Sequence, residues 1–294
     1  MNNKIFLAIV AMFVAACSNE TDNSIDDDTL VPVTVRVSGF SVSQDAFPGT
    51  RATTAPASYD GVDAITLAFY KSDGTEAYKT TQLKSAVPVG KTFGEIELSL
   101  PMGSYTMVVI GRDYFDGDVF TLTSPTSAAY TSDHVRETFT TTQAVNVSTT
   151  AAKEISATLD RMVAKVSVVS TDNRTADVAR IRTSFSAGGK SFNPTTGLAI
   201  DNSGLSNTVG GSGATGATTT ATNFLFLATD EQTMDVTIET LDADGAVLFS
   251  KTVTNVPLRR NRVTTLSGAM YSPAAATASF TLNTDWITGN SVEF

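Results

Sequence analysis

The sequence has very few of the side chains on which enzymes and metalloproteins depend. Among its 294 residues there is one cysteine, Cys17, and one histidine, His134. A single cysteine excludes an internal disulfide, a CxxC redox pair and a cysteine-ligated zinc site, and a single histidine excludes a multi-histidine metal site. Paired carboxylates remain available for acid–base chemistry. We nevertheless expect no enzymatic activity and no bound metal.

Charged residues are scarce and unbalanced. They make up 17% of the chain, and 20 Lys and Arg against 30 Asp and Glu give a net charge of −10, which disfavours nucleic acid as a partner. Residues typical of exposed helices are few, whereas Thr and Val, which favour strands, are abundant. Since 41% of residues are hydrophobic, the composition disfavours both a helical bundle and a disordered chain.

The N-terminus, residues 1–17, is typical of a bacterial lipoprotein signal peptide. A Lys near the start is followed by an apolar run that ends at Cys17 and is too short to span a bilayer permanently. The preceding Val-Ala-Ala resembles a lipobox, which predicts that Cys17 carries the acyl chains, palmitate included, and anchors the mature chain. The residue after the cysteine is Ser18. An Asp at this position would favour retention in the inner membrane, so Ser18 indicates the outer membrane. The alternative is an ordinary signal peptide with a chance cysteine.

Residues 18–30 contain five acidic side chains and no basic one. Such a polar segment cannot bury apolar surface, so we expect an acidic tether between the lipid and the folded part. A short acidic stretch at this place also resembles the surface-export signal of Bacteroidota lipoproteins. A plain solvated linker is an equally good interpretation.

The rest of the chain is patterned as short strands. Residues 31–40 alternate with period two, which predicts a half-buried strand. Its apolar face carries Val31, Val33, Val35 and Val37. Similar segments are 64–70, 95–100, 105–110, 139–147, 154–159, 162–169, 180–186, 223–227, 234–241, 246–253, 263–271 and 279–287. Because Gly, Asp and Pro separate them and no amphipathic helix is evident, the pattern predicts an all-β protein made of β-sandwiches.

Two stretches, 45–58 and 202–223, have loop composition, and we expect them to be exposed loops. The best domain boundary lies near Arg161. It predicts an N-terminal β-sandwich at 31–160 and a C-terminal β-sandwich at 161–294, each large enough to have its own core.

Three groups of residues suggest chemistry, but each has a simpler explanation. Ser132, Asp133 and His134 have the composition of a catalytic triad, yet triads are assembled by geometry and not by adjacency, so a surface histidine is expected. The Asp-Gly segments at 72–74, 116–118 and 242–245 lack the twelfth-position Glu of an EF-hand loop, and we expect turns. Arg259 to Arg262 form a small basic cluster at the start of a predicted strand. A phosphate-binding site is one interpretation, but we expect these charges to be solvated or paired.

Four further segments combine with these features into an ordered set of motifs. They are ITLAFYKSDG (65–74), LSLPMGSYTMVV (98–109), LDRMVAKVSV (159–168) and VPLRRNRVTTLSG (256–268). Together with the lipobox, the acidic tether and Thr50-Arg51-Ala52, the set resembles the fimbrillin superfamily of Bacteroidota. These are the FimA- and Mfa-type pilins of the donor-strand, type V pilus, including the FimB-like anchor subunits. The resemblance covers nearly the whole chain.

The resemblance implies two tandem transthyretin-like β-sandwich domains in a lipoprotein precursor that assembles into a surface fimbria and supports adhesion. It implies other fimbrial subunits as partners, the outer membrane as the site of the lipid anchor, and neither catalysis nor a cofactor. In this family an Arg-specific protease removes an N-terminal strand, and the groove left behind accepts a strand from another subunit. Unpaired backbone groups and an apolar slot make that exchange physically reasonable.

Applied to this chain, the resemblance implies cleavage between Arg51 and Ala52, which removes the strand that carries the four valines. A candidate donor strand lies near the C-terminus, with one face formed by Phe280, Leu282 and Trp286. Two other functions remain open: a lipid-retaining anchor subunit at the fimbrial base, and a surface lipoprotein that binds glycans. A hydrolase is disfavoured because its usual residues are missing.

Overall fold

The computed structural model describes residues 29–42, 52–115, 117, 119–148, 151–210, 214–271 and 281–283. In these ranges the protein is almost entirely β, with only two single-turn 3₁₀ helices, η1 (Pro56–Ser58) and η2 (Lys84–Ala86). The predicted all-β fold is confirmed. None of the described helices is long and apolar enough to cross a membrane.

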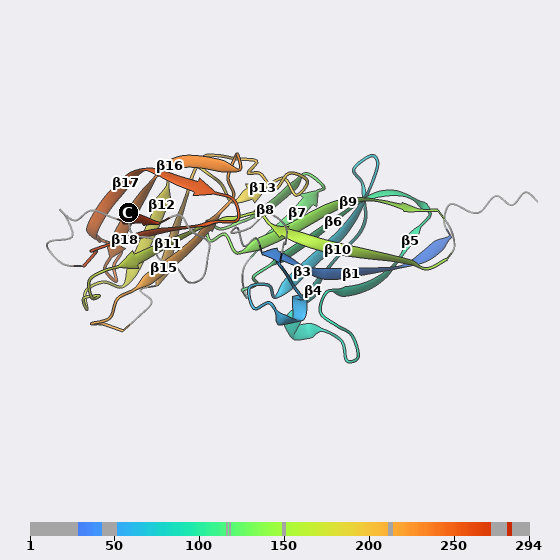
Figure 1. Cartoon of the computed structure of the whole chain (residues 1–294), viewed down its shortest axis with the longest axis horizontal. Helices are drawn as coiled ribbons and strands as arrows, with labels where there is room; N and C mark the ends of the chain where they lie inside the picture. Colours follow the sequence, from blue (N-terminus) through green and yellow to red (C-terminus); the bar gives the residue numbers. More distant parts are fainter. Residues whose placement is uncertain are drawn as a thin grey trace, which may run out of the picture.

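Strand follows strand along the described parts of the chain, as the alternation of apolar and polar residues predicts (Figure 1). The strands before residue 162 are β1 (Leu30–Val42), β2 (Ala52–Thr54), β3 (Ala64–Lys71), β4 (Glu76–Leu83), β5 (Glu95–Pro101), β6 (Gly103–Arg112), β7 (Phe120–Ser124), β8 (Ser127–Tyr130), β9 (Thr138–Val147) and β10 (Lys153–Arg161). Those after it are β11 (Ala164–Ser170), β12 (Arg180–Phe185), β13 (Ser191–Phe192), β14 (Leu205–Gly210), β15 (Thr220–Leu225), β16 (Glu231–Leu241), β17 (Val247–Arg259), β18 (Val263–Gly268) and β19 (Thr281–Asn283).

The first half of the chain is a sandwich made by folding one sheet over. The strand order is β2-β1-β10-β9-β6-β3-β4, with β5 also paired to β1. β9 and β10 are joined by only two residue pairs, Thr140 with Asp160 and Phe139 with Arg161. One apolar cluster contains side chains from β1, β5 and β10 together with side chains from β3, β6 and β9. These two groups of strands therefore face each other across a shared core.

The second half repeats this arrangement with two separate sheets, β15-β11-β18-β19 and β14-β12-β16-β17. β11 lies between β15 and β18 and runs parallel to β18. In the same way, β1 lies between β5 and β10 and runs parallel to β10. The first strand of each half is thus a central strand of its sheet, paired on both sides.

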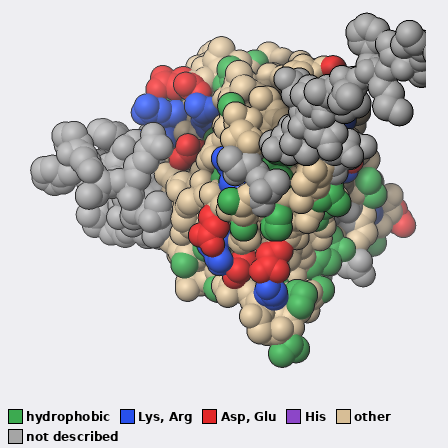
Figure 2. Space-filling view, turned by 90° about the vertical axis from the view of Figure 1, so that its right-hand side faces the viewer, with side chains coloured by type: hydrophobic (Ala, Val, Ile, Leu, Met, Phe, Trp, Pro, Cys, Tyr) green, Lys and Arg blue, Asp and Glu red, His purple; other side chains and the backbone are tan. Residues whose placement is uncertain are grey.

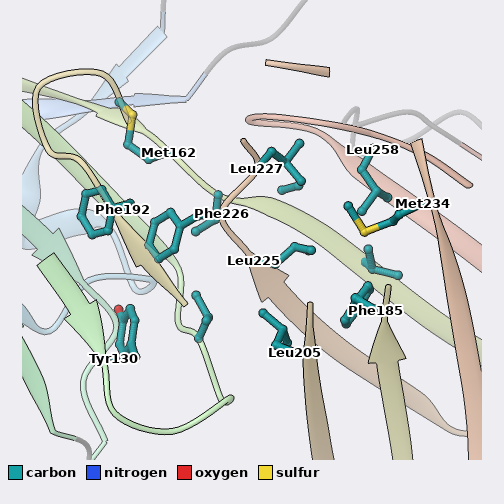
Figure 3. Close-up of a cluster of buried hydrophobic side chains, with 14 of the residues drawn as sticks. Tyr130, Met162, Phe185, Phe192, Leu205, Leu225, Phe226, Leu227, Met234 and Leu258 are labelled. Atoms are coloured by element: carbon teal, nitrogen blue, oxygen red, sulfur yellow. The ribbon is translucent and has the colours of Figure 1, made fainter. Parts of the chain in front are cut away.

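A small sheet, β13-β8-β7, lies between the halves, with β13 from the second half paired to β8 from the first (Figure 1). An apolar cluster continues through this junction and includes Tyr130, Phe192 and Phe226 (Figure 3). β10 ends at Arg161 and β11 begins at Ala164. The division into domains at Arg161 stays a prediction, since a continuous core crosses it.

The two expected loops are partly structured. Residues 52–58 form β2 and η1, and β2 pairs with the end of β1. Residues 205–210 form β14, in which Leu205 and Asn207 are buried. Composition alone missed both strands, because tertiary pairing overrides weak local propensity.

Candidate strand-exchange site

The strand β1 is held on both edges. One edge pairs in parallel with β10, from Val33 to Ser41. The other edge pairs with β5 from Leu30 to Arg36, and then with β2 from Phe40 to Val42. β1 is therefore an interior strand, and its departure would leave unpaired backbone groups on both neighbours.

One face of β1 forms part of the core. Its four predicted apolar side chains are at most 6% exposed: Val31, Val33, Val35 and Val37. The opposite face is polar, and the Arg36 guanidinium lies 2.7 Å from a Glu95 carboxylate oxygen and 3.7 Å from one of Glu154. The predicted alternation is thus present, and the valines face the strands β3, β6 and β9 through a shared cluster.

A β-bulge changes the phase of this alternation near the end of the strand. The register with β10 shifts between Val37 and Gly39, so that Ser38 is an extra residue. The Ser38 hydroxyl donates to the Ala157 carbonyl (3.1 Å). Because of the extra residue, Phe40 turns into the same core as the valines and is fully buried.

Phe40 fills a compartment that we call the aromatic slot, formed by Tyr59, Val62, Gly111, Phe139 and Leu159. Its ring centroid lies 4.9 Å from that of Phe139 and 5.5 Å from that of Tyr59. A Cβ atom on Gly111 would lie 2.8 Å from the Phe40 ring, and 3.3 Å from both Leu159 and Val62. Only glycine at this position of β6 leaves room for the ring.

A buried polar network supports the slot from the side of the second half. The Tyr59 hydroxyl donates to Glu137 Oε1 (2.8 Å) and accepts from Arg161 Nη2 (2.7 Å). Arg161 Nε lies 2.7 Å from Glu137 Oε1, and Nη1 donates to Asn261 Oδ1 (2.9 Å). The guanidinium also lies over the Phe139 ring, 4.8 Å from its centroid. Since the Arg161 side chain is only 2% exposed, this network fixes the Tyr59 ring.

The network predicts a pH dependence above neutrality. Burial, followed by the nearby Glu137 carboxylate, raises the pKa of Tyr59 from 10.0 to about 12. The folded state therefore holds the proton more tightly than the unfolded state, so this stabilisation is complete below pH 10 and is lost as the pH rises towards 12. In the Tyr59→Phe variant, the free energy of unfolding should decrease less steeply with rising pH over this range. Urea denaturation at each pH measures the effect. An unchanged slope would contradict the assignment.

A pocket of about 500 Å³ lies where the pairing of β1 passes from β5 to β2. Its wall includes Val37, Pro56, Phe93 and Ile155, with Arg36, Glu95 and Glu154 among its polar residues. Figure 2 looks at the end of the molecule formed by the first half and shows acidic and basic side chains in small mixed groups. In the pocket itself, Arg36 pairs with both Glu95 and Glu154, so its one basic side chain faces two acidic ones.

The other predicted site residues are only partly within the described structure. Cys17, Arg51, Phe280 and Trp286 lie outside the described residues. Ala52 is the first residue of β2 and pairs with Val42. Leu282 lies in β19, where it pairs with Leu266 of β18. The proposed roles of these residues stay predictions.

The residues that suggested other chemistry have structural partners. The Asp133 carboxylate accepts from Lys190 Nζ (2.8 Å) and from the Ser206 backbone (3.1 Å), and His134 is half-buried beside it. Arg259 and Arg260 pair with Glu231 and Asp230.

Two of the Asp-Gly segments are turns, with the Asp73 and Asp242 carboxylates accepting from nearby backbone N–H groups. Within the described ranges, no three His, Cys, Asp or Glu side chains gather to hold a metal ion.

Sequence reasoning missed the residues that build the slot. Tyr59, Gly111 and Glu137 are far apart in the chain and carry no motif, and Arg161 was noticed only as a boundary. A weak signal was present, because Arg161 directly precedes the apolar residues 162–164, and a buried arginine requires a partner.

Comparisons with known proteins give a family and a fold. A model of a family of unknown function, DUF6562, matches residues 29–287. Among curated proteins, none matches the sequence. The chain is similar to a structure from Bacteroides ovatus provisionally described as an adhesin, with a TM-score of 0.52 and 11% identity over 89% of this chain and 97% of that one.

Two structures from Porphyromonas gingivalis are also similar. They are the fimbrial anchor protein Mfa2 (TM-score 0.48, 12% identity, 87% of this chain and 97% of that one) and the tip fimbrial protein Mfa3 (TM-score 0.41, 11% identity, 87% and 100%). The likeness to the Bacteroides ovatus structure is one of fold, as the predicted resemblance implies. None of the three structures is named as an enzyme.

Proposed function

The chain belongs to DUF6562, a family of unknown function, and we propose that it is a structural subunit of a cell-surface fimbria. In this proposal the precursor is exported as an outer-membrane lipoprotein anchored through Cys17, and subunits assemble by β-strand exchange. An adhesive role at the cell surface agrees with the description of the Bacteroides ovatus structure that has this fold. No step of this function requires a catalytic residue or a cofactor.

The observation that carries the proposal is the position of β1. It is the first described strand, it is interior to its sheet, and its buried valines close one side of the core. It is followed directly by the segment that contains Arg51 and then by β2. Cleavage after Arg51 would therefore separate β1, together with everything that precedes it, from the rest of the fold.

The packing of β1 also indicates how exchange would proceed. Full burial of an aliphatic or aromatic side chain stabilises the packed strand by about 1.5–3 kcal/mol relative to leaving the side chain exposed. β1 buries four valines and Phe40. Because these contacts do not depend on the peptide bond after Arg51, we expect β1 to stay bound after cleavage. An incoming strand then has to displace it, which keeps the apolar groove covered until a partner arrives.

The mass of the subunit in assembled surface fibres tests the proposal. We expect a chain that begins at Ala52 and lacks fatty acid, while the unprocessed precursor carries acyl chains on Cys17. The variant Arg51→Ala should keep the chain that begins at lipidated Cys17 and should not enter fibres, whereas Arg36→Ala, which changes an exposed arginine of β1, should be processed normally. A fibre-associated chain that still begins with lipidated Cys17 would instead identify the anchor subunit. Absence from fibres in either form would reject the fimbrial role.

A further inference from the structure

We propose that the aromatic slot selects the strand that enters the groove, by admitting a strand with an aromatic ring opposite Leu159. This inference rests on the proposed function, since it concerns the same groove. It specifies the chemistry of the partner: an extended segment with alternating aliphatic side chains along the groove and one aromatic side chain at the position that Phe40 occupies.

The slot differs from the rest of the groove in the rigidity of its walls. The valines of β1 belong to a cluster in which most side chains are aliphatic, and aliphatic side chains adapt to similar residues at small cost. In the slot, Tyr59 is fixed by hydrogen bonds to Glu137 and Arg161, and Phe139 is covered by the Arg161 guanidinium. A strand that lacks a ring would leave a cavity that these fixed walls cannot close.

The slot recognises position in the sheet and not spacing in the sequence. Phe40 pairs with Leu159, and Val37 pairs with Ala157. On β10 one residue lies between the two partners, whereas on β1 two residues lie between Val37 and Phe40. The bulge at Ser38 absorbs the difference. A strand without the bulge therefore also fits, provided that its ring lies two residues beyond the last aliphatic side chain and points inward.

Gly111, on β6 across the core from β1, sets the size of the slot. A methyl group there would lie 2.8 Å from the Phe40 ring, which is closer than Cβ contacts normally come. We therefore expect Gly111→Ala to exclude a phenylalanine strand and to accept a strand with a smaller residue. This reversal distinguishes selection by the slot from a general loss of stability.

The experiment uses the full chain with a specific protease site inserted between residues 46 and 47. The cut protein is unfolded in urea and refolded in an equimolar mixture of two synthetic peptides of residues 30–42, and the captured peptide is identified by mass spectrometry. We expect the natural peptide to be captured at least about tenfold more than Phe40→Ala. A peptide in which Phe40 and Ser41 are exchanged has the same composition, but its ring lies four residues beyond Val37 and opposite Asp160 in the natural register, so it should be captured equally poorly. Leu30→Ala, at a position 62% exposed, should compete equally with the natural peptide.

The outcomes separate the two proposals. Equal capture of the natural and Phe40→Ala peptides would overturn selection by the slot. With Gly111→Ala in the chain, the preference should shift towards Phe40→Ala, and an unchanged preference would count against the slot. If the Gly111→Ala variant does not refold, the comparison of the two peptides on the unchanged chain still tests selection by the slot. A separate incubation without urea, with labelled natural peptide, tests the proposed function: a native cut chain that never takes up the peptide contradicts strand exchange but not the selectivity measured on refolding.

Discussion

Replacing Arg161 with Met is expected to lower the free energy of unfolding by about 3–5 kcal/mol, because it breaks a buried ion pair from one side. The Glu137 carboxylate is only 14% exposed and would lose its cationic partner. The carboxylate lies close to Gly61, where an added Cβ atom would clash with Glu137 Oε2. The Tyr59 and Asn261 contacts would be lost together with the charge. Urea denaturation of the full chain measures the effect.

A matched control separates burial from charge. Lys91 pairs with Glu97 at the surface, with side chains 42% and 55% exposed, so Lys91→Met should cost at most about 1 kcal/mol. The double variant Arg161→Met with Glu137→Gln removes both charges and should recover part of the loss. If Arg161→Met costs no more than Lys91→Met, the network does not support the slot in the way proposed here.

The contrast between β1 and the aromatic slot shows how far the sequence predicts this structure. The alternation of Val31, Val33, Val35 and Val37 identifies a strand with one buried face, because period two is a local property of the chain. The inward turn of Phe40 depends on a bulge, and the bulge depends on pairing with β10, more than a hundred residues away in the chain. Local pattern therefore predicts the groove but not the place where it is most selective.

The same distinction holds for the rest of the fold. Segments rich in Val and Ile were predicted as strands, but β14 was hidden in a stretch of Gly, Ser and Thr. Its Asn207 is buried because the side-chain amide donates to Asn223 Oδ1 of β15 (2.9 Å), a partner that no local pattern reveals. Polar residues that satisfy one another across two sheets look like loop residues in a sequence.

Phe226→Ala is expected to destabilise the second half by about 3–5 kcal/mol and to uncouple it from the first. The Phe226 ring is fully buried and stacks on Phe192 with centroids 4.2 Å apart. It also lies 6.4 Å from the ring of Tyr130, which belongs to β8 of the first half (Figure 3). Because one apolar cluster includes all three rings, we expect the unchanged chain to unfold in a single transition.

Hydrogen exchange measured by mass spectrometry resolves the two halves of the Phe226→Ala variant. Protection of β12 and β16 should fall by about two to three orders of magnitude, since each 1.4 kcal/mol is a factor of ten, while β3 and β6 should lose much less. Phe224→Ala is the matched control: this ring is only half-buried at the margin of the cluster, and the Lys165 Nζ lies 5.9 Å from its centroid. It should change protection only slightly. Equal losses of protection in both halves would mean that they remain one cooperative unit without the stack, and that the predicted boundary at Arg161 does not divide independent domains.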